Sequence, residues 1–233
     1  MNPGPPLPAA APANAWPMLR AMVGIGVVCG IAIVGAFELT RPVIERKRAE
    51  ALHRAIFEVL PGAASTRTFR LAADGAFEPL ADGARRDANE PLVHAGYDAS
   101  GALAGFALEA AGMGYQDTIR VLYGYAPGPQ TIVGLRVLES RETPGLGDKI
   151  DVDPDFRANF AALDVALDAA GAAPAHPIEL VRHGEKSRQW QIDAITGATV
   201  SSRAVADLLR DSAAFWTPRL RARLGDFSRE SPE

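Results

Sequence analysis

The chain has a single cysteine among 233 residues, and that cysteine, Cys29, lies inside an apolar N-terminal run. The rest of the sequence therefore has no disulfide, no thiolate nucleophile and no cysteine-ligated metal or iron–sulfur site. The four histidines occur at no ligand spacing, such as His-x-x-His, and predict no metal site. With 24 basic and 28 acidic side chains, the chain lacks the basic excess that a nucleic-acid partner requires.

Hydrolase signatures are also missing. The sequence contains no Gly-x-Ser-x-Gly motif, and its acidic residues form no evident catalytic pair. Three other features of the sequence are unusual: one long apolar run and two short glycine-containing motifs.

The apolar run extends without a charge from Ala21 to Phe37. With Met18 and Leu19 included and Arg20 at the membrane surface, it is just long enough for the ~20 residues that cross a bilayer. A cleaved signal peptide would have a shorter apolar region and a small-residue exit, and a buried helix of a soluble protein would show a polar stripe. We therefore predict a transmembrane helix over residues 18–40.

The pattern after this helix predicts an α+β fold. Apolar residues at helical spacing predict a stalk helix over residues 41–61, which ends at Pro61-Gly62. Alternating apolar segments then predict a small antiparallel-sheet domain with flanking helices over residues 62–225. Residues 1–17, rich in proline and alanine, and residues 226–233 are predicted to be disordered tails.

Turn signals divide the predicted domain into elements. The strand pairs are 68–71 with 76–80, 91–97 with 103–110, 118–125 with 131–139, and 178–181 with 190–192, each expected to form a hairpin. Helices are predicted over 155–167, 201–215 and 218–224.

The first short motif is Asp193-Ala-Ile-Thr196-Gly197-Ala198-Thr199, which stands directly before the predicted helix. A helix N-terminus presents free N–H groups and the positive end of its dipole, and both favour a phosphate. The small residues before Thr199 leave its hydroxyl accessible to a bulky ligand or enzyme. Thr196, Ser201 and Ser202 are further phosphate donors by type, and plain N-capping explains the same hydroxyls equally well.

The second motif follows a predicted strand and reads Glu142-Thr143-Pro144-Gly145-Leu146-Gly147-Asp148-Lys149. As a local pattern it predicts a turn, because Pro-Gly is a turn signal and glycine adopts positive φ. Such a loop also brings backbone amides close to a flat ring, and Lys149 is available to stabilise a negative charge. The residues alone leave both interpretations open.

Together the two motifs resemble the FMN-binding domain shared by the G subunit of the Rnf electron-transport complex and the C subunit of the Na⁺-translocating NADH:quinone reductase. Residues 142–147 correspond to that family's Glu-Thr-Pro-Gly-Leu-Gly loop, and residues 193–199 to its flavinylation signal. Gly112-Met-Gly-Tyr115 resembles a Gly-x-Gly-Tyr segment of the Rnf subunit. The departures are Thr196, where serine is frequent, and Met113, where an aromatic residue is common.

The resemblance implies covalently bound FMN. A Mg²⁺-dependent flavin transferase would use FAD as the donor and join the FMN phosphate to Thr199 through a phosphoester. The implied cofactor-binding residues are Thr199, Thr196, Gly197, Ala198 and Asp193 at the attachment site, and Glu142, Thr143, Leu146, Gly147, Lys149 and Tyr115 near the ring. From the residues alone, Asp193 can instead cap its own turn, Lys149 can be a solvated surface lysine, and Tyr115 can be a core aromatic residue.

The resemblance further implies a component of an Rnf complex rather than a stand-alone enzyme. The complex couples electron transfer between ferredoxin and NAD to ion translocation, so the partners would be other membrane, iron–sulfur and flavin subunits. The expected location is the bacterial inner membrane, with a single span and the FMN domain in the periplasm. The flanking charges favour the opposite orientation, because Arg20 alone precedes the span and five basic residues follow it by Arg54.

Two alternatives differ from this interpretation. Within the family, the chain could be the C subunit of the quinone reductase. From another class, it could be a membrane-tethered binding domain without a cofactor, in which Thr-Gly-Ala-Thr only begins a helix.

Overall fold

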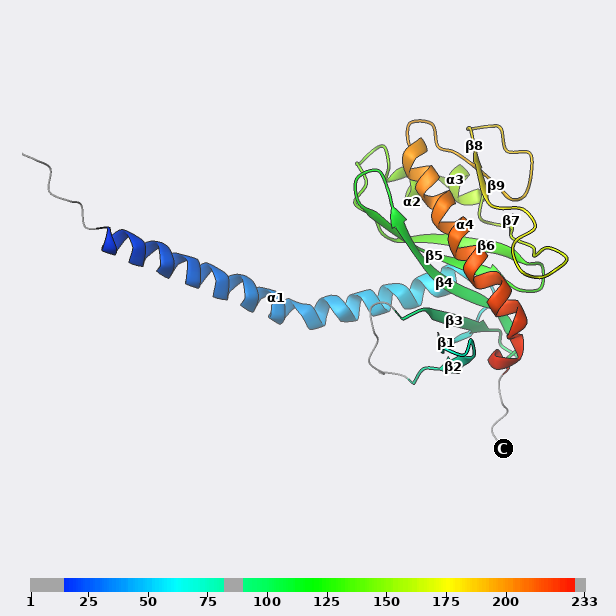
Figure 1. Ribbon diagram of the computed structural model, residues 1–233, viewed down its shortest axis with the longest axis horizontal. Helices are drawn as coiled ribbons and strands as arrows, with labels where there is room; N and C mark the ends of the chain where they lie inside the picture. The colour runs from blue at the N-terminus through cyan, green and yellow to red at the C-terminus, as the bar shows by residue number, and fades with distance from the viewer. Residues whose placement is uncertain (1–14, 82–89, 229–233) are drawn as a thin grey trace, which may run out of the picture. The chain divides into compact units, whose positions relative to one another are not determined.

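The computed structural model of the chain describes residues 15–81 and 90–228 (Figure 1). Most of both predicted tails therefore lies outside the described residues. The chain divides into two compact units, residues 1–50 and residues 51–233. The division falls inside the segment predicted as a stalk helix, and the two units are described separately below.

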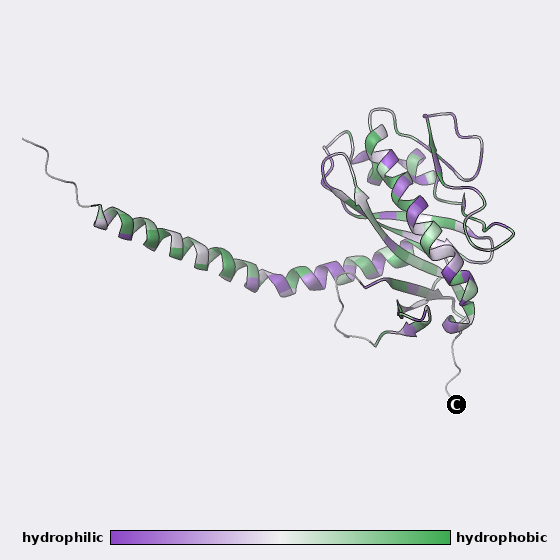
Figure 2. Cartoon of the chain, viewed as in Figure 1, coloured by the Kyte–Doolittle hydropathy of each residue, from purple (hydrophilic) through white to green (hydrophobic). Residues whose placement is uncertain are grey.

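The first unit consists of most of helix α1, which runs from Trp16 to Val59 without interruption. The segments predicted as transmembrane helix and stalk helix are therefore parts of one helix. The residues of its N-terminal part are mostly hydrophobic, as the green and pale ribbon in Figure 2 shows, and hydrophilic residues become frequent further along the helix. Among the described residues, α1 is the one helix long and apolar enough to cross a membrane.

The second unit is built on a seven-stranded sheet in the order β2-β1-β3-β4-β5-β6-β7, with antiparallel neighbours throughout. The strands are β1 Ser65–Leu71, β2 Phe77–Pro79, β3 Leu92–Tyr97, β4 Leu103–Met113, β5 Thr118–Ala126, β6 Thr131–Glu139 and β7 Leu163–Asp164. The first three predicted hairpins are present, and the predicted α+β class with an antiparallel sheet is confirmed.

Helix α4, Thr199–Ala222, covers one face of this sheet (Figure 1). Its apolar side chains, Val205 and Leu209 among them, are fully buried in the same core cluster as Phe106 and Val121 of the strands. The smaller helices are α2 Lys149–Val152, α3 Pro154–Ala158 and the 3₁₀ helix Leu224–Phe227. Phe227, inside the segment predicted as a C-terminal tail, is fully buried in the core.

The last turns of α1 belong to the second unit and cover the opposite face of the sheet. Ile56 and Val59 pack against Ala107 and Leu122, which alternate along their strands with the residues that face α4. Gly124 makes this approach possible, because a Cβ atom there would overlap the carbonyl oxygen of Val59. The sheet is therefore buried on both faces, so a ligand site is expected at the loops and helix termini around its edges.

The predicted helix 155–167 is wrong beyond its first residues. Helix α3 ends at Ala158, and the chain continues into β7. Asn159 ends the helix, because its side-chain amide donates back to the carbonyl oxygen of Phe156 at 3.0 Å. The following residues pair with β6 and with Gln130, so tertiary pairing prevails over local helix propensity.

The predicted hairpin 178–181 with 190–192 is also wrong in its direction. Strands β8 Glu179–Val181 and β9 Gln191–Asp193 do pair, but they run parallel. The connecting segment returns the chain to the start of β8, and it turns at Gly184, which has a positive φ of 81°. The carboxylate of Asp193 holds that turn, as described below.

The C-terminal helices 201–215 and 218–224 are one helix, α4, which begins at Thr199 and continues through Pro218. An internal proline costs about 3 kcal/mol, because it removes an N–H group and crowds the preceding turn. Trp216 and Leu220 are buried on either side, so the packing of α4 outweighs the cost of the proline.

Candidate functional site

The two sequence motifs meet at the N-terminus of α4. They line a common cavity of about 360 Å³, together with the turn between β4 and β5. Its lining residues are Tyr115, Glu142, Thr143, Leu146, Gly147, Gly197, Ala198, Thr199, Val200 and Ser201. All the predicted site residues except Asp193, Thr196 and Lys149 therefore line this cavity. A volume of this size is typical of ligand sites.

The start of α4 has no side-chain cap. Its N-cap residue is Ala198, and the first helical hydrogen bond runs from the Ser202 N–H to the Ala198 carbonyl oxygen at 2.9 Å. Alanine is a poor N-cap residue, because it offers no oxygen to the free N–H groups of the first turn. Thr199 is the first residue of the helix and is exposed, shortly after Gly197 with its positive φ of 86°. An uncapped helix start thus faces the cavity beside an accessible hydroxyl.

The neighbouring serines are engaged inside the protein. Ser202 is fully buried, and its hydroxyl accepts from the Ile195 N–H at 3.2 Å and donates to the Ala198 carbonyl oxygen at 2.9 Å. The Ser201 hydroxyl is also buried and donates to the Glu142 carboxylate. The two serine hydroxyls therefore neither cap the helix nor are free for a phosphate, and instead they tie the start of α4 to the two motifs.

Glu142 is almost completely buried, with 6% of its surface exposed. One carboxylate oxygen accepts from Ser201, and the other accepts from the backbone N–H of Gln116 at 3.0 Å. We call this set of three residues the Glu142 clasp. Burial by itself raises the pKa of Glu142, but the Ser201 hydroxyl and the backbone N–H groups of residues 115–117 outweigh it and hold that pKa below its usual value.

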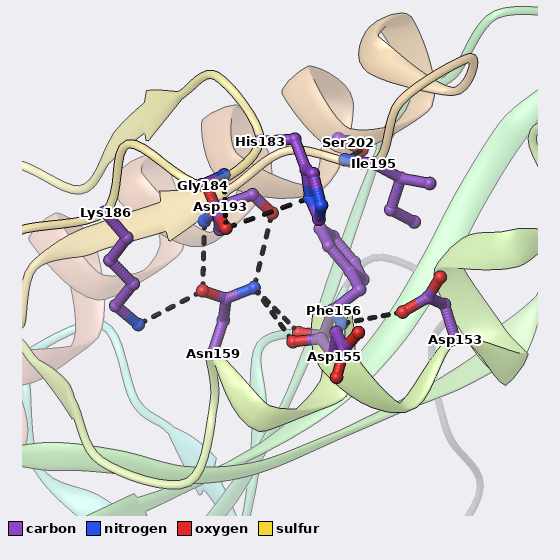
Figure 3. Close-up of polar contacts among 10 residues, drawn as sticks. All are labelled: Asp153, Asp155, Phe156, Asn159, His183, Gly184, Lys186, Asp193, Ile195 and Ser202. Carbon is purple, nitrogen blue, oxygen red and sulfur yellow. Dashed lines mark hydrogen bonds and ion pairs between the residues drawn. The ribbon is translucent and has the colours of Figure 1, made fainter.

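The other three predicted residues, Lys149, Asp193 and Thr196, line a neighbouring cavity of about 260 Å³. Both carboxylate oxygens of Asp193 accept from the Gly184 N–H at 2.8 Å, and one of them lies 3.9 Å from Nδ1 of His183 (Figure 3). Asp193 therefore caps the turn between β8 and β9 rather than its own turn. Lys149, the first residue of α2, lines this second cavity and not the larger one.

Asn159 is a buried residue that the sequence analysis did not select. Its side-chain oxygen accepts from the Asp193 N–H at 3.0 Å, and its amide nitrogen donates to the Asp193 carbonyl oxygen at 3.3 Å (Figure 3). Lys186 donates to the same Asn159 oxygen at 3.1 Å. Burial lowers the pKa of the Lys186 ammonium, and the negative charge of Asp193 opposes that effect. We call Asn159, Asp193 and Lys186 the Asn159 clamp.

Gln116 was also missed by the sequence analysis. Besides its backbone contact with Glu142, its side-chain oxygen accepts from the Thr143 hydroxyl at 3.2 Å. Its position directly after the Gly-x-Gly-Tyr segment was a usable signal. No comparable signal marks Asn159, because nothing in the pattern around this asparagine indicates burial.

The fold and the cavity define the class of the protein. The family model described as FMN-binding domain matches residues 114–214, which include both motifs. The fold is similar to that of NqrC from Shewanella oneidensis, with a TM-score of 0.59 and 21% identity over 79% of this chain and 98% of that chain. It is also similar to the C subunit of the Na⁺-translocating NADH-quinone reductase from Parabacteroides distasonis, with a TM-score of 0.51, 19% identity and coverage of 67% and 78%.

Sequence relatives specify the family further. The G subunit of the ion-translocating oxidoreductase complex of Methanosarcina acetivorans is 32% identical over 193 residues, which cover 82% of this chain and 88% of the relative. The corresponding G subunit of Cereibacter sphaeroides is 32% identical over 209 residues, with coverage of 85% and 84%. The chain therefore belongs to the family of G subunits of ion-translocating oxidoreductase complexes. The predicted resemblance to the Rnf G subunit is confirmed, whereas the likeness to the C subunits concerns the fold alone.

Proposed function

We propose that this chain is a membrane-anchored electron-transfer component of an Rnf-type complex and carries FMN joined to Thr199 by a phosphoester. One observation carries the proposal: the two motifs converge on one cavity at an uncapped helix N-terminus, where the Thr199 hydroxyl is exposed. The membership of the chain in the G-subunit family and its FMN-binding domain support the same conclusion.

The residues at the start of α4 fit a phosphate. The N–H groups of the first turn have no side-chain cap, and the helix dipole contributes about 0.3–1 kcal/mol toward a negative charge at this position. A phosphate on the Thr199 oxygen would take the place of the missing N-cap side chain. Thr196, Gly197 and Ala198 would leave the segment open to the flavin transferase, because their side chains are small.

The rest of the cavity fits a flat, largely apolar ring. Tyr115, Leu146 and Val200 line the cavity and are 70%, 50% and 54% exposed, so together they form an exposed apolar patch in its wall. A bound isoalloxazine would cover part of this surface, with Thr143 and Gly147 in its wall. Asp193 and Lys149 line the neighbouring cavity, so we propose no direct contact between them and the ring. Asp193 would act within the attachment segment, and Lys149 would supply a positive charge nearby.

Bound FMN supplies one- and two-electron transfer, and the protein holds it in place and adjusts its potential. The partners we propose are the other membrane, iron–sulfur and flavin subunits of the complex, which couples ferredoxin and NAD chemistry to ion translocation. Helix α1 would anchor the chain in the bacterial inner membrane, with the FMN domain in the periplasm. A reporter fused to the C-terminus tests the orientation, and a cytoplasmic signal would contradict it.

The attachment is tested by intact-mass spectrometry of the full chain, produced with and without a Mg²⁺-dependent flavin transferase. The wild type should gain the mass of one FMN minus water only when the transferase is present. The Thr199→Ala variant should gain nothing, and Thr199→Ser should be modified. Thr118→Ala is the matched control, because Thr118 is an exposed threonine outside both motifs, and it should be modified like the wild type. Flavin that stays on Thr199→Ala through denaturation would overturn the proposal.

A further inference from the structure

Glu142 holds together three segments that are far apart in the sequence. Its carboxylate contacts the turn between β4 and β5 through Gln116 and the first turn of α4 through Ser201, and Glu142 itself begins the 142–147 loop. All its hydrogen-bond donors are uncharged, namely the Ser201 hydroxyl and backbone N–H groups of residues 115–117. The negative charge of this buried side chain therefore has no partner cation among the described residues.

The surrounding glycines have no room for side chains. A Cβ atom on Gly114 would lie 2.5 Å from one Glu142 oxygen, and a Cβ atom on Gly147 would lie 2.6 Å from the other. The Gly147 position would also bring a Cβ atom within 2.8 Å of the Ser201 hydroxyl. The two glycines thus let the backbone close around the carboxylate, which lies in the wall of the cavity that both motifs line.

We propose that Glu142 is a positioning residue whose retained negative charge, in the wall of the cavity, lowers the reduction potential of the flavin bound there. The proposal rests on the flavin-binding function proposed above. A fixed negative charge opposes further negative charge in the same partly desolvated cavity, so it disfavours the reduced state. Glu142 acts through this field and through the loop that it holds, since both its oxygens are already occupied by protein donors.

Two variants separate the charge from the shape of the clasp. Glu142→Gln keeps the length of the side chain and an oxygen for the Gln116 N–H, but it removes the charge. Ser201→Ala keeps the charge and removes one hydrogen bond to it. Glu139→Gln is the control, because Glu139 is an exposed acid three residues away that lines no described cavity.

The measurements are spectroelectrochemical titration of the flavin on the full chain in detergent and thermal unfolding of the flavin-free protein. Glu142→Gln should raise the equilibrium constant for flavin reduction by about tenfold, which corresponds to a midpoint potential about 30 mV higher for a two-electron couple. Ser201→Ala should shift the potential much less than Glu142→Gln does, because the charge remains, while it lowers the melting temperature of the flavin-free protein. Glu139→Gln should change neither quantity.

An unchanged potential in Glu142→Gln would overturn the inference, and so would equal shifts in Glu142→Gln and Ser201→Ala, which would indicate loop displacement rather than charge. These outcomes require wild-type protein that carries flavin. A wild-type chain that never acquires flavin would instead overturn the proposed function, and the unfolding of the flavin-free variants would still show whether the clasp holds the loop.

Discussion

The Glu142 clasp and the Asn159 clamp hold the two ends of the 193–199 motif by different chemistry. The clamp contacts Asp193 at the beginning of the motif, and the clasp contacts Ser201 just after its end. An asparagine amide both donates and accepts, so it pairs with a backbone N–H and C=O as a neighbouring strand would. A carboxylate only accepts, so it gathers donors from several segments and keeps its charge.

The clamp and the clasp therefore have different roles at one site. The clamp is suited to fixing the backbone, since its bonds supply partners for groups of Asp193 at the end of β9. The clasp also fixes a loop, but it adds an electrostatic field to the cavity wall. Changes in the clamp should therefore act mainly on folding, whereas changes in the clasp should act on folding and on the bound flavin separately.

The largest effect is expected for Asn159→Ala. The change leaves the backbone N–H and C=O of Asp193 without their partner, at a cost of about 1–3 kcal/mol for each buried group. We expect the free energy of unfolding to fall by about 3 kcal/mol in urea unfolding of the full chain in detergent. Asn159→Asp keeps the acceptor but sets an oxygen against the carbonyl oxygens of Phe156 and Asp193, so it should lose about as much. A loss under about 0.5 kcal/mol, the range of ordinary surface changes, would show that the clamp is dispensable.

A somewhat smaller loss is expected for Gly147→Ala in the clasp. The added methyl group would overlap the Glu142 carboxylate, and overpacking of this kind costs about 1–3 kcal/mol. Gly128→Ala is the matched control, because no atom lies within 4 Å of the position that its Cβ atom would take. Thermal unfolding of the flavin-free chain compares the two variants. Equal melting temperatures would contradict the tight closure around Glu142.

The pH dependence of stability should test whether Glu142 in the clasp is ionised. Because the pKa of folded Glu142 is held below its unfolded value, its stabilising contribution is present above that unfolded value and is lost as the pH falls through the folded pKa. The stability difference between wild type and Glu142→Gln should therefore shrink in acid, from about pH 5 downward. Asp117 and Arg141 pair with each other beside the same turn, so Asp117→Asn serves as the control. A difference independent of pH would contradict an ionised Glu142.

The smallest effect is expected for Asp193→Asn in the clamp. The asparagine oxygen can still accept from the Gly184 N–H, so the turn between β8 and β9 should remain, with a loss under about 1 kcal/mol. Asp193→Ala removes the acceptor and should lose more. Urea unfolding compares the pair, and equal losses would mean that the charge of Asp193, rather than its hydrogen bond, holds the turn.

Local patterns predicted much of the fold. The three hairpins of the main sheet follow from alternating apolar residues and from turns such as Asp98-Ala-Ser-Gly101, where the Asp98 carboxylate accepts from the Ser100 N–H at 2.8 Å. The errors occur where distant contacts decide. The parallel pairing of β8 and β9 depends on Asp193 and Gly184, and the passage of α4 through Pro218 depends on the burial of Trp216.

The candidate site was predicted from its two motifs, and the structure brings most of those residues into one cavity. The prediction did not separate lining residues from residues that hold the lining in place. Ser202 is typical, because a serine after Thr-Gly-Ala-Thr fits capping, phosphate binding or burial equally well in sequence terms. Only its buried contacts with Ile195 and Ala198 identify its role.

The sequence by itself determined the apolar helix, the main hairpins and the accessible threonine at the start of α4, because each depends on neighbours within a few residues. The tertiary structure alone decided which polar groups are buried together. Glu142 and Ser201 are 59 positions apart, and Asn159 and Asp193 are 34 apart. Burial makes an unpartnered polar group costly, so these contacts exist only where the packed chain brings a donor and an acceptor to the same place.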